Sequence, residues 1–154
     1  RARYTFQVLD LGQTPWQIAA DRRQFDMIVS FATLHHIPSL SLQQEFFMQV
    51  ASLLETNGTF IISCWQPLNS PRLAKRVQNW DVLDIDPNEL SESDLVLDWR
   101  ADDQCETQNW RYVHQFTPEK LKSLGETAGL IFKETFYSDG KEGNLGLYQV
   151  WQKP

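Results

Sequence analysis

Cysteine is nearly absent from this sequence of 154 residues. Cys64 and Cys105 are too few for a disulfide scaffold or a four-cysteine zinc site, and they suit a reducing compartment. No apolar run approaches the length of about 18 residues that spans a membrane, and residues 1–4 lack the apolar core of a signal peptide. The net charge of −6 argues against a nucleic-acid binder that relies on its own basic face. We therefore expect a cytoplasmic domain with no membrane contact.

Large apolar side chains are plentiful. Hydrophobic residues make up 42% of the chain and include six tryptophans and nine phenylalanines, enough for one core in a single domain over residues 1–154. Acidic residues gather between 84 and 106, where nine acids and one base give a charge of −8, against +2 for the remainder. That segment is either a solvated surface loop or an insert that covers a cleft.

Strand-like and helical segments alternate along the chain, which predicts an α/β fold. Strands are expected over 5–9, 27–31, 59–65, 131–137 and 145–152, and helices over 41–54, 70–80 and 117–128. The continuous apolar run at 27–31 predicts a strand buried on both faces. Ser41 and Gln44 form a candidate capping box, and Asn57-Gly58 is a candidate helix end.

The segment 25–38, FDMIVSFATLHHIP, carries the clearest functional signal. A buried strand ends there in small residues, followed by His35, His36 and a proline. Ligands bind at the carboxyl ends of the strands in open parallel sheets, so 31–36 is expected at a ligand-binding edge. From the residues alone, the histidine pair serves either packing and capping or catalysis. Adjacent histidines point in different directions, so no metal site is predicted.

This segment resembles the fourth motif of class I S-adenosylmethionine-dependent methyltransferases. LLETNGTFII at 53–62 is similar to the next helix-to-strand turn of that family, and DLGQTPW at 10–16 is similar to its adenine-side loop. The resemblance implies an incomplete Rossmann-like α/β sheet with three αβα layers and S-adenosylmethionine as cofactor. The implied cofactor-binding residues are Asp10, Leu11, Phe31, Ala32 and His36.

Two later segments resemble one branch of the family, which methylates the carboxymethyl group on the wobble uridine of tRNA. They are DLVLDW at 94–99 and RYVHQF at 111–116, with Asp98 and Val113 departing from the pattern. The resemblance implies a tRNA-modifying transferase whose acceptor carboxylate is already ionised and needs no general base. The implied substrate-binding residues are His35, Trp99, Arg111, Tyr112 and His114. The alternative places Trp99 and Phe116 in the core and pairs Arg111 with the acidic segment.

The sequence contains no G-x-G element, although the family's cofactor loop is rich in glycine. We therefore expect the C-terminal two-thirds of the fold, and weak or no binding of the cofactor by this chain alone. Its open apolar edge should be closed by 5–9 pairing with 27–31, or by a partner chain or a second copy in a homodimer. Two further functions stay open: a methyltransferase acting on a small-molecule carboxylate or hydroxyl, and a non-catalytic binding subunit.

Overall fold

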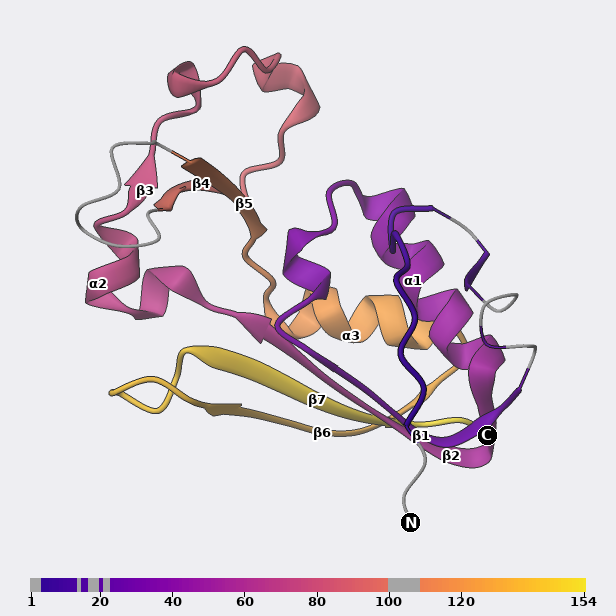
Figure 1. Cartoon of the computed structure of the whole chain (residues 1–154). Helices are drawn as coiled ribbons and strands as arrows, with labels where there is room; N and C mark the ends of the chain where they lie inside the picture. The colour runs from indigo at the N-terminus through magenta and orange to yellow at the C-terminus, as the bar shows by residue number, and fades with distance from the viewer. Residues whose placement is uncertain (1–3, 14, 17–19, 21–22, 100–108) are drawn as a thin grey trace.

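A four-stranded sheet forms the base of the molecule (Figure 1). The computed structural model describes residues 4–13, 15–16, 20, 23–99 and 109–154. The strand order is β1 (Phe25–Phe31), β2 (Leu54–Trp65), β7 (Gly146–Gln152) and β6 (Ile131–Ser138). β1 and β2 are parallel, whereas β7 runs antiparallel to both of its neighbours. The mixed α/β class expected from the sequence is confirmed.

Two helices, α1 (Leu40–Leu53) and α3 (Pro118–Thr127), cover the same face of this sheet (Figure 1). The core lies between them and the strands, where the ring of Phe47 meets Phe60 at 5.6 Å and Trp151 at 6.2 Å, both edge to face. Gly125 lets α3 approach closely, since a Cβ there would lie 2.4 Å from the Trp151 ring. In the described part of the chain the opposite face carries no helix, so two of the three expected layers are present.

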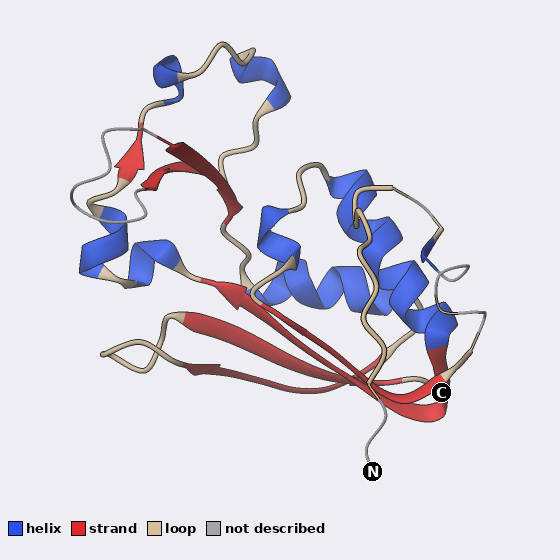
Figure 2. Ribbon diagram, viewed as in Figure 1, coloured by secondary structure: helices blue, strands red, loops and turns tan. Residues whose placement is uncertain are grey.

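A smaller antiparallel sheet stands beside the end of the main sheet (Figure 2). It consists of β3 (Val77–Gln78), β4 (Asp94–Trp99) and β5 (Asn109–His114). Leu73, Leu97 and Val113 form its own buried cluster. Two short helices, η3 (Pro67–Asn69) and α2 (Pro71–Ala74), connect β2 of the main sheet to β3. Two more, η4 (Trp80–Val82) and η5 (Pro87–Glu89), lie between β3 and β4.

Helix α1 begins and ends differently from the prediction. Ser39, not Ser41, is its N-cap, with a side chain that accepts from the Leu42 N–H at 3.4 Å. Its last residue leads directly into β2, so Asn57 lies inside a strand with φ 65°. The left-handed tolerance of Asn57 therefore produces the register shift opposite β1, not a helix end.

The prediction of a helix over 70–80 is wrong beyond its first turn. Pro71 starts α2, but the helix ends at Ala74 and the chain continues into β3. The acidic segment 84–106 is not simply a solvated surface loop, because β4 lies within it. One face of this strand places Leu97 in the buried cluster, while the other face carries Asp94, the buried Val96 and Asp98. Residues 100–108 lie outside the described chain.

The predicted strand over 5–9 is not formed, so it does not pair with β1. Phe6 and Val8 are almost fully exposed. The chain contacts α1 further on, at Trp16, whose backbone N–H donates to Gln49 Oε1 at 2.7 Å. Burial of β1 on both faces is also wrong. Met27 and Val29 are about half exposed because no helix of the described chain covers that face. No described helix is long and apolar enough to cross a membrane.

Candidate functional site

The parallel pair β1 and β2 ends at one edge of the main sheet, as the sequence predicts. There Ala32 adopts φ 53°, an uncommon conformation for a residue with a side chain. Its N–H donates to the Ser63 carbonyl at 3.1 Å and approaches Ser63 Oγ at 3.2 Å. This turn sends the chain into η2 (Leu34–His36), which carries the histidine pair at the carboxyl ends of both strands.

His35 points inward from this turn. It is fully buried and stacks on Trp65 with ring centroids 5.2 Å apart. The Trp65 N–H donates to its Nδ1 at 3.1 Å, so the ring proton is on Nε2, which has no partner among the described residues. Burial, with smaller effects from His36 and Arg111, lowers its pKa from 6.5 to about 3. His35 is therefore neutral and supports Trp65 from within, presenting no surface to a ligand.

His36, Trp65 and Arg111 come together from three elements. His36 Nδ1 donates to the Tyr112 carbonyl at 2.8 Å, since a carbonyl can only accept. Burial lowers the pKa of His36, although this hydrogen bond partly opposes the shift. The Arg111 guanidinium lies 5.8 Å from the centre of the Trp65 ring, a cation–π distance. Burial lowers the pKa of Arg111 as well, yet a guanidinium stays charged at neutral pH.

The Asp10 carboxylate is turned toward its own loop. Asp10 accepts from the Gly12 N–H at 2.9 Å and from Gln13 Nε2 at 3.1 Å, one bond to each oxygen. Each oxygen keeps a lone pair for a further donor. Leu11 packs against the main core and holds the loop in place.

Phe31 does not turn toward this edge. Its ring lies 6.2 Å from Tyr148, which in turn stacks on Phe136 at 5.0 Å. Tyr148 alternates along β7 with Leu147 and Gln149, which are buried beneath the helices. The row of Phe31, Tyr148 and Phe136 therefore lies on the helix-free face of the sheet.

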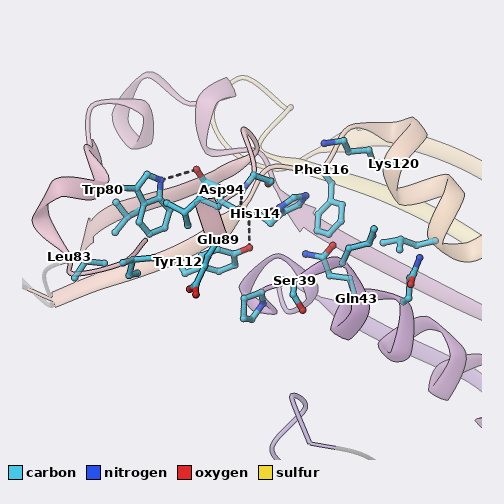
Figure 3. Close-up of a pocket in the computed structure, with 18 of the residues that line it drawn as sticks. Ser39, Gln43, Trp80, Leu83, Glu89, Asp94, Tyr112, His114, Phe116 and Lys120 are labelled. Carbon is cyan, nitrogen blue, oxygen red and sulfur yellow. Dashed lines mark hydrogen bonds and ion pairs between the residues drawn. The ribbon is translucent and has the colours of Figure 1, made fainter. Parts of the chain in front are cut away.

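A cavity of about 1040 Å³ lies between the small sheet, η4 and η5, and the two helices (Figure 3). Aromatic side chains from η4, β5 and the loop after β5 form much of its wall: Trp80, Trp110, Tyr112 and Phe116. Tyr112 connects the two regions, because its carbonyl binds His36 at the sheet edge while its side chain lines the cavity.

Asp94 organises the polar wall of this cavity. Its Oδ1 accepts from the Tyr112 hydroxyl at 2.7 Å and from His114 Nδ1 at 2.6 Å, and its Oδ2 accepts from the Ser91 N–H at 2.8 Å (Figure 3). Burial raises the pKa of Asp94, but these hydrogen bonds outweigh it and the net shift is downward. Burial and the bond to Asp94 raise the pKa of Tyr112. The cluster is thus a carboxylate whose one oxygen is held by a hydroxyl and an imidazole.

The residues expected to bind substrate thus divide between two places. Arg111 lies at the sheet edge, whereas the side chains of Tyr112 and His114 lie in the cavity. Trp99 ends β4, and its side chain lies outside the described structure. Sequence reasoning missed Asp94 as a site residue, although Tyr112 and His114 at alternate positions of a strand must share one face.

Metal and thiol chemistry find little support in the described residues. No group of three or more histidine, cysteine, aspartate or glutamate side chains there could hold a metal ion. Cys64 is fully buried in β2, and burial raises the pKa of its thiol, which makes it an inert packing residue.

The chain matches a family model described as a methyltransferase domain over residues 4–131. A methyltransferase structure from Methanosarcina mazei, described as S-adenosylmethionine-dependent, is 16% identical with a TM-score of 0.66, covering 96% of this chain and 66% of that one. Another from Clostridium acetobutylicum, of the same description, is 12% identical with a TM-score of 0.63, covering 96% and 63%. An N-methyltransferase from Bradyrhizobium japonicum in complex with S-adenosyl-L-homocysteine is 12% identical with a TM-score of 0.54, covering 95% and 52%.

These likenesses concern the fold, because the identities are low. The chain spans about two thirds or less of the length of these structures. No curated protein sequence matches it.

Proposed function

This chain belongs to the methyltransferase-domain family, and from that premise we propose that it serves S-adenosylmethionine-dependent methyl transfer to a small organic acceptor. The observation that supports this function is the convergence of His36, Trp65 and Arg111 at the carboxyl ends of two parallel strands. A large cavity opens on the other side of β5, joined to that edge through Tyr112. The sheet edge suits the cofactor, and the cavity suits the acceptor.

The described residues fit the adenosine end of the cofactor. Asp10 has lone pairs left for an adenine amino group, and Ala32 turns the chain with a positive φ at the end of β1. The Phe31 ring offers nothing here, since it lies on the helix-free face. The sequence has no glycine-rich loop whose N–H groups could hold the methionine end. We therefore propose that this chain alone holds the cofactor weakly.

The bound cofactor would supply a methyl group on a positively charged sulfur. Arg111 would attract an anionic group to this edge, because its guanidinium stays charged and lies over the Trp65 ring. The neutral His36 would orient the acceptor through Nε2 while its Nδ1 holds β5 in place. Such positioning lowers the activation barrier by several kcal/mol. In well-aligned reactions, orientation can supply about 7–11 kcal/mol.

A tRNA acceptor is the second candidate, supported by the resemblance of 94–99 and 111–116 to the wobble-uridine enzymes. Two lysines that could bind the phosphates of a tRNA already have partners within this chain. Lys120 donates to Ser93. Lys122 pairs with Glu126 and lies over the Phe132 ring. Val113, where the resembled pattern has an aromatic residue, is fully buried in the small core. These features and the overall charge of −6 favour the small acceptor.

Isothermal titration with S-adenosyl-L-homocysteine tests the proposal. We expect saturable heat with a dissociation constant in the high micromolar range, and at least about tenfold weaker binding by Asp10→Ala, a loss of about 1.4 kcal/mol. Asp26→Ala, which alters an exposed aspartate at the opposite end of β1, is the matched control and should bind like the wild type.

No heat at millimolar ligand from a folded chain would overturn cofactor binding by this chain and favour the non-catalytic binding subunit. For the acceptor, filter binding with unmodified tRNA distinguishes the candidates. Tight, salt-sensitive binding that is lost in Arg111→Ala would favour tRNA over a small molecule.

A further inference from the structure

We propose that the cavity takes a neutral aromatic acceptor through a hydroxyl group, and that His114 Nε2 accepts the proton of that hydroxyl. This inference rests on the proposed function, because it names the class of acceptor that methyl transfer would use. It differs from the carboxylate acceptor that the sequence resemblance implies, which would need no proton acceptor. The inference follows from the hydrogen bonds of one aspartate and from the composition of the cavity wall.

The hydrogen bonds at Asp94 fix the tautomer of His114. An ionised carboxylate can only accept, so the 2.6 Å contact requires the ring proton to lie on Nδ1. In the neutral ring with this tautomer, the remaining nitrogen, Nε2, is an acceptor with a lone pair. No group in the described chain bonds to it, and His114 lines the cavity. An imidazole oriented by a carboxylate in this way is the arrangement that proteins use for general bases.

The second bond to Asp94 makes this arrangement rigid. The Tyr112 hydroxyl donates to the same oxygen, and the Ser91 N–H occupies the other one. Phe116 packs edge to face against the His114 ring with centroids 4.5 Å apart. His114 is therefore held by a hydrogen bond on one side and a ring contact on another, so Nε2 keeps a fixed position.

The remainder of the wall selects for an aromatic ligand without a negative charge. Trp80, Trp110 and Phe116 offer ring faces and edges, and the volume of about 1040 Å³ exceeds that of a single aromatic ring. The charged groups that face the cavity are Glu89 and Asp94 from the acidic segment and Lys120 from α3. Lys120 keeps its charge while it donates to the Ser93 hydroxyl, but the two acids outnumber the one lysine and so disfavour an anionic ligand.

The proton step balances within these groups. The O–H bond of the ligand breaks, its electron pair stays on the oxygen, and the proton forms an N–H bond at His114 Nε2. The resulting imidazolium is stabilised by the adjacent Asp94 carboxylate. The ligand becomes a phenolate, a stronger nucleophile for a methyl group than the neutral hydroxyl.

The probe para-nitrophenol tests this step without cofactor, because its phenolate absorbs visible light. We expect the full chain to bind it and to raise its ionisation constant at least about tenfold, one pKa unit. His114→Gln should keep binding but lose the rise, and Asp94→Asn should lose most of it. Lys133→Ala, an exposed lysine on β6, is the control and should behave like the wild type.

A second ligand keeps the test independent of how the variants fold. Para-nitroanisole has the same ring but no hydroxyl proton, so it should bind the wild type at least about tenfold more weakly. Equal affinities for the two ligands, absence of binding by para-nitrophenol, or an undiminished rise in His114→Gln would each overturn the inference. Cofactor binding is measured separately by the titration with S-adenosyl-L-homocysteine. Failure of the proposed function can therefore be distinguished from failure of this inference.

Discussion

His36 and Tyr112 are joined across 76 positions of the sequence by a hydrogen bond of 2.8 Å, from the imidazole Nδ1 to the backbone carbonyl. The bond ties the end of β1 in the main sheet to β5 in the small sheet. Because the Tyr112 side chain lines the cavity, the candidate cofactor edge and the candidate acceptor site share this residue. The geometry of one region therefore depends on the other.

Loss of this bond should lower stability. His36→Phe keeps a ring but removes the donor, leaving a partly buried carbonyl without a partner, so we expect a loss of about 1–2 kcal/mol in the free energy of unfolding. Urea denaturation followed by tryptophan fluorescence measures it. His36→Asn retains an N–H donor and should recover part of the loss. If His36→Phe and wild type unfold at the same urea concentration, the bond does not hold the sheets together.

The buried His35 should make the fold sensitive to mild acid. Its pKa is about 3 in the folded chain and 6.5 in the unfolded chain. Between these values the unfolded chain binds a proton at this residue and the folded chain does not. Stability therefore falls as the pH drops from 6.5 toward 3. Between pH 7 and pH 5 the expected loss from this residue is about 2 kcal/mol.

Denaturant unfolding at several pH values compares wild type with His35→Gln, whose amide oxygen can still accept from the Trp65 N–H. The variant should lose much less stability between pH 7 and pH 5. His36 contributes with the same sign in both proteins, because its pKa is also lowered. Identical pH profiles would contradict this prediction, because they would mean that protonation of the fully buried His35 ring costs no stability.

The contact between α3 and β7 should tolerate no added methyl group. Gly125→Ala would place a Cβ 2.4 Å from the Trp151 ring, and that ring is enclosed by Phe47 and Phe132. We expect a loss of about 1–3 kcal/mol from overpacking, despite the better helix propensity of alanine. Ser123→Ala, at an exposed position of the same helix, is the control. A stabilised Gly125→Ala would show that α3 can move away from the sheet.

Elements governed by local signals were predictable from the sequence. Thr117 and Pro118 start α3 as expected, with the Thr117 side chain accepting from the Lys120 N–H, and the last two strands lie close to their predicted ranges. Elements that depend on pairing with another part of the chain were not predictable. The segment 5–9 has a strand-like composition but forms no strand, and α2 ends at Ala74 because the chain turns to pair with β4.

The candidate site was predictable in position but not in its side-chain directions. The motif placed 31–36 at the correct sheet edge, yet the sequence could not show that His35 faces inward or that Phe31 joins Tyr148 on the helix-free face. Asp94 was hidden among nine acids in an apparently solvated segment. Its role depends on β4 pairing with β5, which brings it opposite His114.

The helix-free face of the sheet should make this chain self-associate. Met27, Val29 and Phe31 are each about half exposed along β1, next to an edge whose backbone has no strand partner in the described chain. We propose that a second chain covers this surface, and sedimentation velocity over a range of concentrations should then show a species larger than the monomer. Val29→Lys should shift the distribution toward monomer, because pairing would bury the added charge. Met48→Lys makes the same change at an equally exposed position on α1 and should leave the distribution unchanged. A chain that stays monomeric at high concentration would contradict the proposal.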